Sequence, residues 1–175
     1  MAIERVGVIG GGLMGSGIAE VCARAGSDVV VHEIDAGAAE AALTRIEASL
    51  GKAVDRGKLE APQRDEIFGR ISVATDLDRQ SDRDLIIEAA TENEELKRAI
   101  FGDLDRIAPS GAILASNTSS IPIVEIAASV GDRGRQVLGL HFFNPVPVLP
   151  LVEIIPSLPK TRSGKIMRRL LKDIA

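Results

Sequence analysis

The sequence predicts an α/β fold with a doubly wound, mostly parallel sheet. Short runs rich in β-branched residues alternate along the chain with longer segments whose apolar residues recur at helical spacing. A glycine-rich turn follows the first short run and opens the first helical segment. Strands that alternate with helices pair in parallel, and right-handed crossovers place the helices on both faces of the sheet. The expected architecture is therefore of the Rossmann type.

Each element is expected from its own local pattern. The β-branched runs predict strands at 5–9, 29–32, 71–74, 85–88, 113–115 and 137–140. The apolar spacing between them predicts helices at 13–25, 36–56, 62–68, 93–107 and 121–128. Ligands of such sheets collect beyond the carboxyl ends of the strands. Three polar segments follow strands there, at 89–93, 116–120 and 141–144, and we expect them to converge.

Composition limits the classes of function. The chain has 175 residues with 45% apolar and 26% charged residues, which predicts one globular domain with a small appendage. A net charge of -4 and the lack of Trp and Tyr argue against a nucleic-acid partner. Prolines interrupt the apolar run 137–156, so no membrane span is expected. Cys22 is the only cysteine, which excludes an internal disulfide and suits a cytoplasmic protein.

The glycine-rich turn predicts a dinucleotide site. Gly10 allows the tight turn after the strand, Gly12 lets the backbone approach a pyrophosphate, and Gly15 lets the helix pack close to the sheet. Leu13 and Met14 open the helix, whose N-terminus faces the phosphates. The motif begins at the tenth residue, so no leader segment is expected before the fold. No metal site is predicted.

Glu33 predicts the choice of dinucleotide. It ends the second strand, where a carboxylate accepts hydrogen bonds from the adenosine ribose and repels a 2′-phosphate. The expected cofactor is therefore NAD rather than NADP. A second interpretation stays open, in which Glu33 is a solvated charge and the glycines only form a turn. The neighbouring His32 is expected to line the adenosine side.

His141 is the candidate acid and base of the site. It stands at the end of a strand, where the sheet directs it toward the nicotinamide half of a bound cofactor. Glu153 follows after a proline-broken stretch and is placed to orient the imidazole. Two plainer interpretations remain: a structural histidine, and an edge-strand carboxylate that faces water.

Four ordered segments together resemble the 3-hydroxyacyl-CoA dehydrogenases, especially the bacterial 3-hydroxybutyryl-CoA dehydrogenases. The segments are GGGLMGSGIA, IIEAATEN, ASNTSS and GLHFFNPVPVLPLVEII, and the resemblance covers residues 3–158. It implies hydride transfer between NAD and a 3-hydroxyacyl-CoA, with an acyl-CoA as the partner molecule. Hydride and redox chemistry would belong to the cofactor, and the protein would supply placement and charge stabilisation.

The resemblance also implies roles for six residues. His141 is the catalytic acid and base, and Glu153 is its partner. Ser119 and Asn144 hold the substrate oxygen, whereas Glu92 and Asn117 line the nicotinamide side. For Ser119 a second interpretation stays open, because its residue type also favours a helix cap before Ile121.

Residues 159–175 resemble a different family, the C-terminal end of acyl-CoA synthetases of the adenylate-forming family. That resemblance implies that Lys165 is a modification site for a lysine acetyltransferase or deacetylase. Members of the first family continue into a helical domain that this sequence lacks. We therefore expect a truncated fusion with impaired catalysis and a tendency to self-association. A non-catalytic NAD-binding fragment and a carrier of the Lys165 peptide remain alternatives.

The same tail has a strong charge pattern of its own. Residues 160–175 hold six basic residues and one acidic residue, which gives +5 and leaves -9 for the rest of the chain. Its apolar residues recur at helical spacing and predict a basic amphipathic helix. The helix is expected either to dock on the sheet domain or to remain free, with binding to a membrane surface a lesser alternative.

Overall fold

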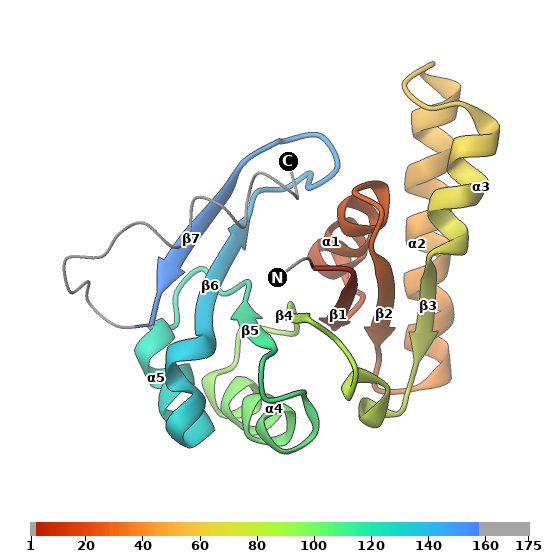
Figure 1. The fold of residues 1–175 in the computed structure, drawn as a ribbon. Coiled ribbons are helices and arrows are strands. Elements are labelled where there is room, and N and C mark those ends of the chain that lie inside the picture. The colour runs from red at the N-terminus through yellow and green to blue at the C-terminus, as the bar shows by residue number, and fades with distance from the viewer. Residues whose placement is uncertain (1–2, 158–175) are drawn as a thin grey trace.

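The computed structural model describes residues 3–157, which form a seven-stranded sheet covered by helices on both faces (Figure 1). Six strands run parallel, and the last strand is antiparallel to its neighbour. The predicted doubly wound α/β class is confirmed. Lys165 and the predicted tail helix lie outside the described residues.

The sheet has the strand order β3-β2-β1-β4-β5-β6-β7. Its strands are β1 (Arg5–Ile9), β2 (Asp28–His32), β3 (Ile71–Ala74), β4 (Leu85–Glu88), β5 (Ile113–Ser116), β6 (Val137–Phe142) and β7 (Val152–Pro156). The chain leaves β1 toward β2 on one side and later returns to β4 on the other. The carboxyl ends of β1 and β4 therefore lie at the switch point where such sheets bind ligands.

Two groups of helices enclose two apolar cores. The helices are α1 (Leu13–Arg24), α2 (Ala36–Asp55), α3 (Ala61–Gly69), α4 (Glu94–Ile107) and α5 (Ile123–Ala127), with 3₁₀ turns at Leu77–Gln80 and Ala128–Gln136. Helices α1 to α3 pack with Val6 and Val8 of β1 on one face. Helices α4 and α5 pack with Ile9 on the other face. Successive strand side chains point to opposite faces, which explains this division.

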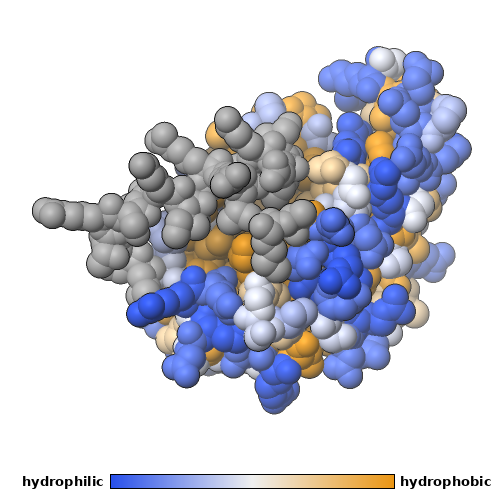
Figure 2. Space-filling view, in the orientation of Figure 1, coloured by the Kyte–Doolittle hydropathy of each residue, from blue (hydrophilic) through white to orange (hydrophobic). Residues whose placement is uncertain are grey.

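The outer surfaces agree with this packing. Figure 2 shows hydrophilic side chains over the outer part of α2 and α3, while their inner residues Ile46, Leu50 and Ile67 are buried in the core. Among the described helices, none is long and apolar enough to cross a bilayer.

The structure departs from the expected elements mainly near the end of the sheet. Strand β6 extends through Phe142, so His141 lies within the strand rather than after it. Strand β7 was not among the six expected strands, because the prolines around it obscure its pattern. Helix α5 is shorter than expected and passes into a 3₁₀ turn. The 3₁₀ turn Leu77–Gln80 was also not expected, whereas the other strands and α-helices agree with expectation to within one or two residues at their ends.

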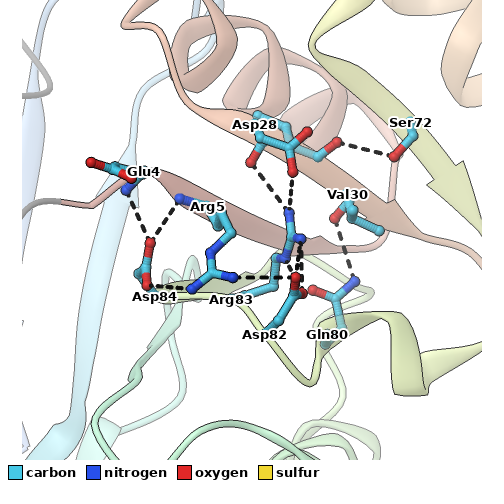
Figure 3. Close-up of polar contacts among 10 residues, drawn as sticks. Glu4, Arg5, Asp28, Val30, Ser72, Gln80, Asp82, Arg83 and Asp84 are labelled. Atoms are coloured by element: carbon cyan, nitrogen blue, oxygen red, sulfur yellow. Dashed lines mark hydrogen bonds and ion pairs between the residues drawn. The ribbon is translucent and has the colours of Figure 1, made fainter.

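A cluster of charges joins the strands at their amino ends, opposite the switch point (Figure 3). Arg83 is almost buried, and its guanidinium donates to Asp28 Oδ2 at 2.7 Å and to both carboxylate oxygens of Asp82. Asp84 accepts hydrogen bonds from the backbone amides of Glu4 and Arg5 at 3.0 and 2.8 Å. These contacts tie β1, β2 and β4 together without involving the carboxyl edge.

We expect Arg83→Met to destabilise the fold by about 1–3 kcal/mol, because a nearly buried cation loses its charge-assisted hydrogen bonds. Urea unfolding checks this value. The matched control is Arg70→Met, which removes an exposed ion pair with Glu66 and should cost less than about 1 kcal/mol. Equal losses in the two variants would contradict the structural role of Arg83.

Candidate active site

The glycine turn after β1 is built around close backbone contacts. Gly10 has a φ of +91°, a conformation that side chains rarely adopt, and its amide donates to the carbonyl of His32 at 2.9 Å. A Cβ on Gly15 would lie 1.7 Å from the carbonyl oxygen of Gly10, so only glycine allows α1 to approach the turn. Among residues 3–157, no atom lies within 4 Å of where a Cβ on Gly12 would stand. The space beside Gly12 is therefore open to a ligand.

The N-terminus of α1 has the properties of an anion site. Gly12 is its N-cap, no side chain caps it, and no acidic residue lies in its first turn. The first amides of a helix lack intrahelical acceptors, and the helix dipole favours negative charge at this end. Gly12 and Leu13 are exposed, and Met14 is partly exposed. The arrangement fits a pyrophosphate group, as the sequence predicts.

Glu33 lies against this turn. Its Oε1 accepts a hydrogen bond from the amide of Gly11 at 2.5 Å, and its Oε2 accepts from the amide of Ile34 at 3.3 Å. The carbonyl of Gly11 accepts from Ser16 Oγ at 2.6 Å and from Arg45 Nη1 at 3.2 Å. Arg45 was not predicted, since its partner lies 34 positions away in the sequence. The carboxylate is thus held beside the glycine turn, where it can meet the ribose of a dinucleotide.

We expect Glu33→Gln to relax the choice of dinucleotide. Removal of the negative charge should improve the binding of NADPH about tenfold and weaken that of NADH severalfold. Fluorescence titration of each reduced cofactor measures both constants. Glu40→Gln removes the same charge from the exposed face of α2 and serves as the control. An unchanged ratio in Glu33→Gln would show that the carboxylate does not discriminate between the cofactors.

A buried ion pair follows β4 at the switch point. Lys97 Nζ lies 2.7 Å from Glu88 Oε1, and both side chains are at most 1% exposed. Glu88 also accepts from the amide of Ala90 at 2.7 Å and from Ser116 Oγ at 2.6 Å. The pair therefore connects β4, α4 and the end of β5. Neither Glu88 nor Lys97 was among the predicted site residues.

Glu92 connects the loops that follow β4 and β5. Its Oε1 accepts hydrogen bonds from Thr118 Oγ1, from the amide of Ser119 at 3.1 Å, and from the amide and hydroxyl of Ser120 at 3.1 and 2.8 Å. Its Oε2 lies 3.6 Å from Lys97 Nζ. Partial burial raises the pKa of Glu92, but these hydrogen bonds and the Lys97 charge outweigh it and lower the pKa to about 2. Glu92 is therefore ionised at neutral pH.

We expect this shift to appear in the acid stability of the chain. A lowered pKa means that Glu92 stabilises the fold fully above its ordinary value of 4.5 and ceases to do so as the pH falls toward 2. Because 38% of the side chain is exposed, solvent screening limits the effect to about 1–2 kcal/mol. Unfolding of wild type and Glu92→Gln should therefore differ more at pH 5 than at pH 2.5. Parallel curves would contradict the assignment.

His141 and Glu153 face each other across β6 and β7. The two residues are register partners in this antiparallel pair, and His141 Nδ1 lies 3.1 Å from Glu153 Oε2. The imidazole is 25% exposed and contacts the ring of Phe143 edge to face at 4.8 Å. Glu153 lies on the edge strand and its side chain is exposed, as the plainer interpretation expects. Its carboxylate also contacts His141, which that interpretation does not include. The engaged Nδ1 leaves Nε2 of His141 for a ligand.

The three polar segments converge, as expected. The backbone amide of Asn117 donates to the backbone carbonyl of Glu88 at 2.7 Å, and the side-chain Oδ1 of Asn117 accepts from the backbone amide of Phe142 at 2.9 Å. Ser119 is exposed beside Glu92. Asn144 is exposed in the segment after β6. Within residues 3–157 no hydrogen bond joins His141 to Ser119 or Asn144, so their roles remain predictions.

The helix-cap interpretation of Ser119 is wrong. Helix α5 begins at Ile123 with Pro122 as its N-cap, and no side chain caps it. The amide of Ile121 donates instead to Thr118 Oγ1 at 3.0 Å. The hydroxyl of Ser119 is therefore not used as a cap.

Comparisons with known proteins identify the family of this chain. The family model described as "3-hydroxyacyl-CoA dehydrogenase, NAD binding domain" matches residues 5–171. A 3-hydroxybutyryl-CoA dehydrogenase of Mycobacterium tuberculosis is 53% identical over 158 residues, which are 90% of this chain and 55% of that protein. A probable 3-hydroxybutyryl-CoA dehydrogenase of Bacillus subtilis is 45% identical over the same length, with the same coverage.

A solved structure shows the same fold. The crystal structure of (S)-3-hydroxybutyryl-CoA dehydrogenase from Ralstonia eutropha superposes with a TM-score of 0.90 at 38% identity, covering 99% of this chain and 61% of that one. The chain thus spans a little over half the length of the relatives that it matches. Its glycine turn, helix N-terminus and Glu33 fit the cofactor that the family model names. The chain belongs to the 3-hydroxyacyl-CoA dehydrogenase family, matches its NAD-binding domain, and takes NAD as its cofactor.

Proposed function

We propose that this chain carries out the NAD-dependent oxidation of a 3-hydroxyacyl-CoA, 3-hydroxybutyryl-CoA being the first candidate substrate. The observation that carries the proposal is the His141–Glu153 pair, an imidazole held through Nδ1 at the carboxyl edge of a dinucleotide-binding sheet. The named relatives point to the same substrate.

His141 moves the proton in this mechanism. Its Nε2 takes the proton of the substrate hydroxyl, and Glu153, bound to Nδ1, stabilises the imidazolium that forms. When bound, NAD would supply the redox chemistry, since it would accept a hydride from the carbon that carries the hydroxyl. In the reverse direction Nε2 returns the proton to the oxygen of the 3-keto group.

The remaining predicted residues bind and orient. We assign Gly10, Gly12, Leu13, Met14 and Gly15 to the pyrophosphate and Glu33 to the adenosine ribose. Glu92 and Asn117 line the nicotinamide side, while Ser119 and Asn144 hold the substrate oxygen. Ser119 is exposed next to Glu92 and Asn144 is exposed beyond β6, so both are accessible to a substrate.

The test is turnover by the purified chain. Acetoacetyl-CoA and NADH are incubated with the protein, and the consumption of NADH is followed by absorbance. Consumption that is proportional to protein concentration is the expected result. Cofactor binding without any consumption at high protein concentration would overturn the proposal and leave an NAD-binding fragment.

We further propose that the chain self-associates through the segment between β6 and β7. Val148, Leu149 and Leu151 are exposed there, and Ile155 of the edge strand β7 is also exposed. Exposed apolar groups on an edge strand favour pairing with another copy. Light scattering after size exclusion tests this, with Leu149→Ser and Leu151→Ser expected to shift the chain toward monomer.

For residues 159–175 we propose the acyl-CoA-synthetase-like tail, with Lys165 as a substrate of a lysine acetyltransferase or deacetylase. The proposal rests on the sequence of the tail alone. The family model reaches residue 171, so the boundary at 158 stays a prediction. Mass spectrometry of the chain purified from cells lacking deacetylase activity should find acetylation at Lys165 if the proposal holds.

A further inference from the structure

Glu88 is a buried carboxylate that the proposed mechanism leaves without a role. It ends β4 and is 0% exposed. Its two oxygens contact Lys97 Nζ, the Ala90 amide and Ser116 Oγ, all within 2.7 Å. A buried ion pair alone is weak evidence for a contribution to stability, because desolvation cancels much of the attraction. Its placement in the fold is more informative.

The charges around Glu88 do not cancel. Lys97 lies between two carboxylates, with Nζ 2.7 Å from Glu88 Oε1 and 3.6 Å from Glu92 Oε2. The low pKa of Glu92 keeps that carboxylate ionised. The remaining partners of the network are the neutral groups of Ala90, Ser116, Thr118, Ser119 and Ser120. With both carboxylates and Lys97 ionised, the cluster carries a net charge of about -1.

This net charge lies at the switch point. The Ala89 amide donates to the Ile9 carbonyl at 2.8 Å, and a Cβ on Gly10 would lie 3.1 Å from the backbone of Ala89 and Ala90. The loop after β4 therefore contacts the glycine turn. The same loop carries Glu92, which the proposed function places on the nicotinamide side. Low-dielectric surroundings strengthen the field of a buried charge at this point.

We propose that Glu88 is a positioning residue that holds Lys97 and gives this cluster its net negative charge, so that the site favours oxidised over reduced cofactor. The nicotinamide ring of NAD⁺ carries a positive charge, whereas that of NADH is neutral. A net negative charge beside the ring therefore stabilises only the oxidised form. The inference rests on the proposed function, since it takes Glu92 to line the nicotinamide side.

The test compares two dissociation constants in the 175-residue chain. Glu88→Gln keeps one acceptor oxygen for Lys97 and the Ala90 amide, and its NH₂ group can donate to Ser116 Oγ in place of the second oxygen. It removes the charge and should weaken the binding of NAD⁺ about five- to tenfold. The dissociation constant of NADH should change less than about twofold, because its ring carries no charge. Calorimetry measures the dissociation constant of NAD⁺, and the fluorescence of bound NADH measures that of NADH. The matched control is Glu66→Gln, which removes the same charge from the exposed face of α3, far in the sequence from Glu88, and should change neither dissociation constant.

Equal weakening of both cofactors in Glu88→Gln would mean a purely structural role and would overturn the proposal, as would no change in either. If Glu88→Gln does not fold, Glu92→Gln decides, because its partly exposed carboxylate supplies the second negative charge. Glu92→Gln should also weaken the binding of NAD⁺ more than that of NADH. Equal weakening of the two cofactors would again overturn the proposal. Binding needs no acyl-CoA turnover, so a chain that binds cofactor without catalysis disproves only the proposed function.

Discussion

Replacement of His141 by alanine is expected to lower kcat with acetoacetyl-CoA and NADH by about 10²–10⁴-fold, the usual contribution of a positioned acid and base. In the proposed function the imidazole exchanges a proton with the substrate oxygen, and Nδ1 is already bound to Glu153. The dissociation constant of NADH should change less than twofold, because the residues that we assign to the cofactor, the glycine turn and Glu33, lie at another part of the sheet edge. Steady-state rates and cofactor titration measure the two quantities.

Glu153→Gln is the matched control for His141→Ala. It keeps a side chain of the same size opposite His141 in the β6–β7 register but removes the charge that favours imidazolium. We expect kcat to fall by about 10–100-fold, less than in His141→Ala, as for other groups that orient a reacting side chain. A joint loss of turnover and cofactor binding in His141→Ala would instead show that the histidine is structural.

The fold followed from the sequence because its main signals are local. Val6, Val8 and Ile9 lie in a short β-branched run, and the glycine turn directly after it has few other structural uses. The end of the sheet was harder to predict. Pro150 and Pro156 flank Glu153, the register partner of His141, and obscure the strand pattern of β7. The antiparallel pairing of β7 with β6 depends on a contact between strands that no local pattern shows.

The site was only partly predictable for the same reason. Glu33 stands at a recognisable strand end, so its position could be deduced from spacing. Arg45 and Lys97 lie on helices, where a single basic residue is usually a solvated charge. Only the folded chain brings Arg45 to the Gly11 carbonyl and buries Lys97 against Glu88. Lys97 was missed, and the one signal that could have indicated it is its position near the start of a helix that follows a polar strand end.

Lys97→Met is expected to destabilise the fold by about 3–5 kcal/mol, the usual cost of leaving a buried charge without its partner. Methionine fills a similar volume, so the loss comes from Glu88, which keeps Ser116 Oγ and the Ala90 amide but no cation. For a chain of this size the melting temperature should fall by about 10 °C. Chemical unfolding and calorimetry measure the change.

The double variant Glu88→Gln/Lys97→Met separates the ion pair from packing. Removing both charges leaves no buried unpaired ion, so the double variant should recover at least half of the stability that Lys97→Met loses. Arg98→Met, on the next position of α4, removes an exposed pair with Glu94 and should cost less than about 1 kcal/mol. Additive losses in the double variant would show that the aliphatic stem of Lys97, rather than its charge, stabilises the carboxyl edge.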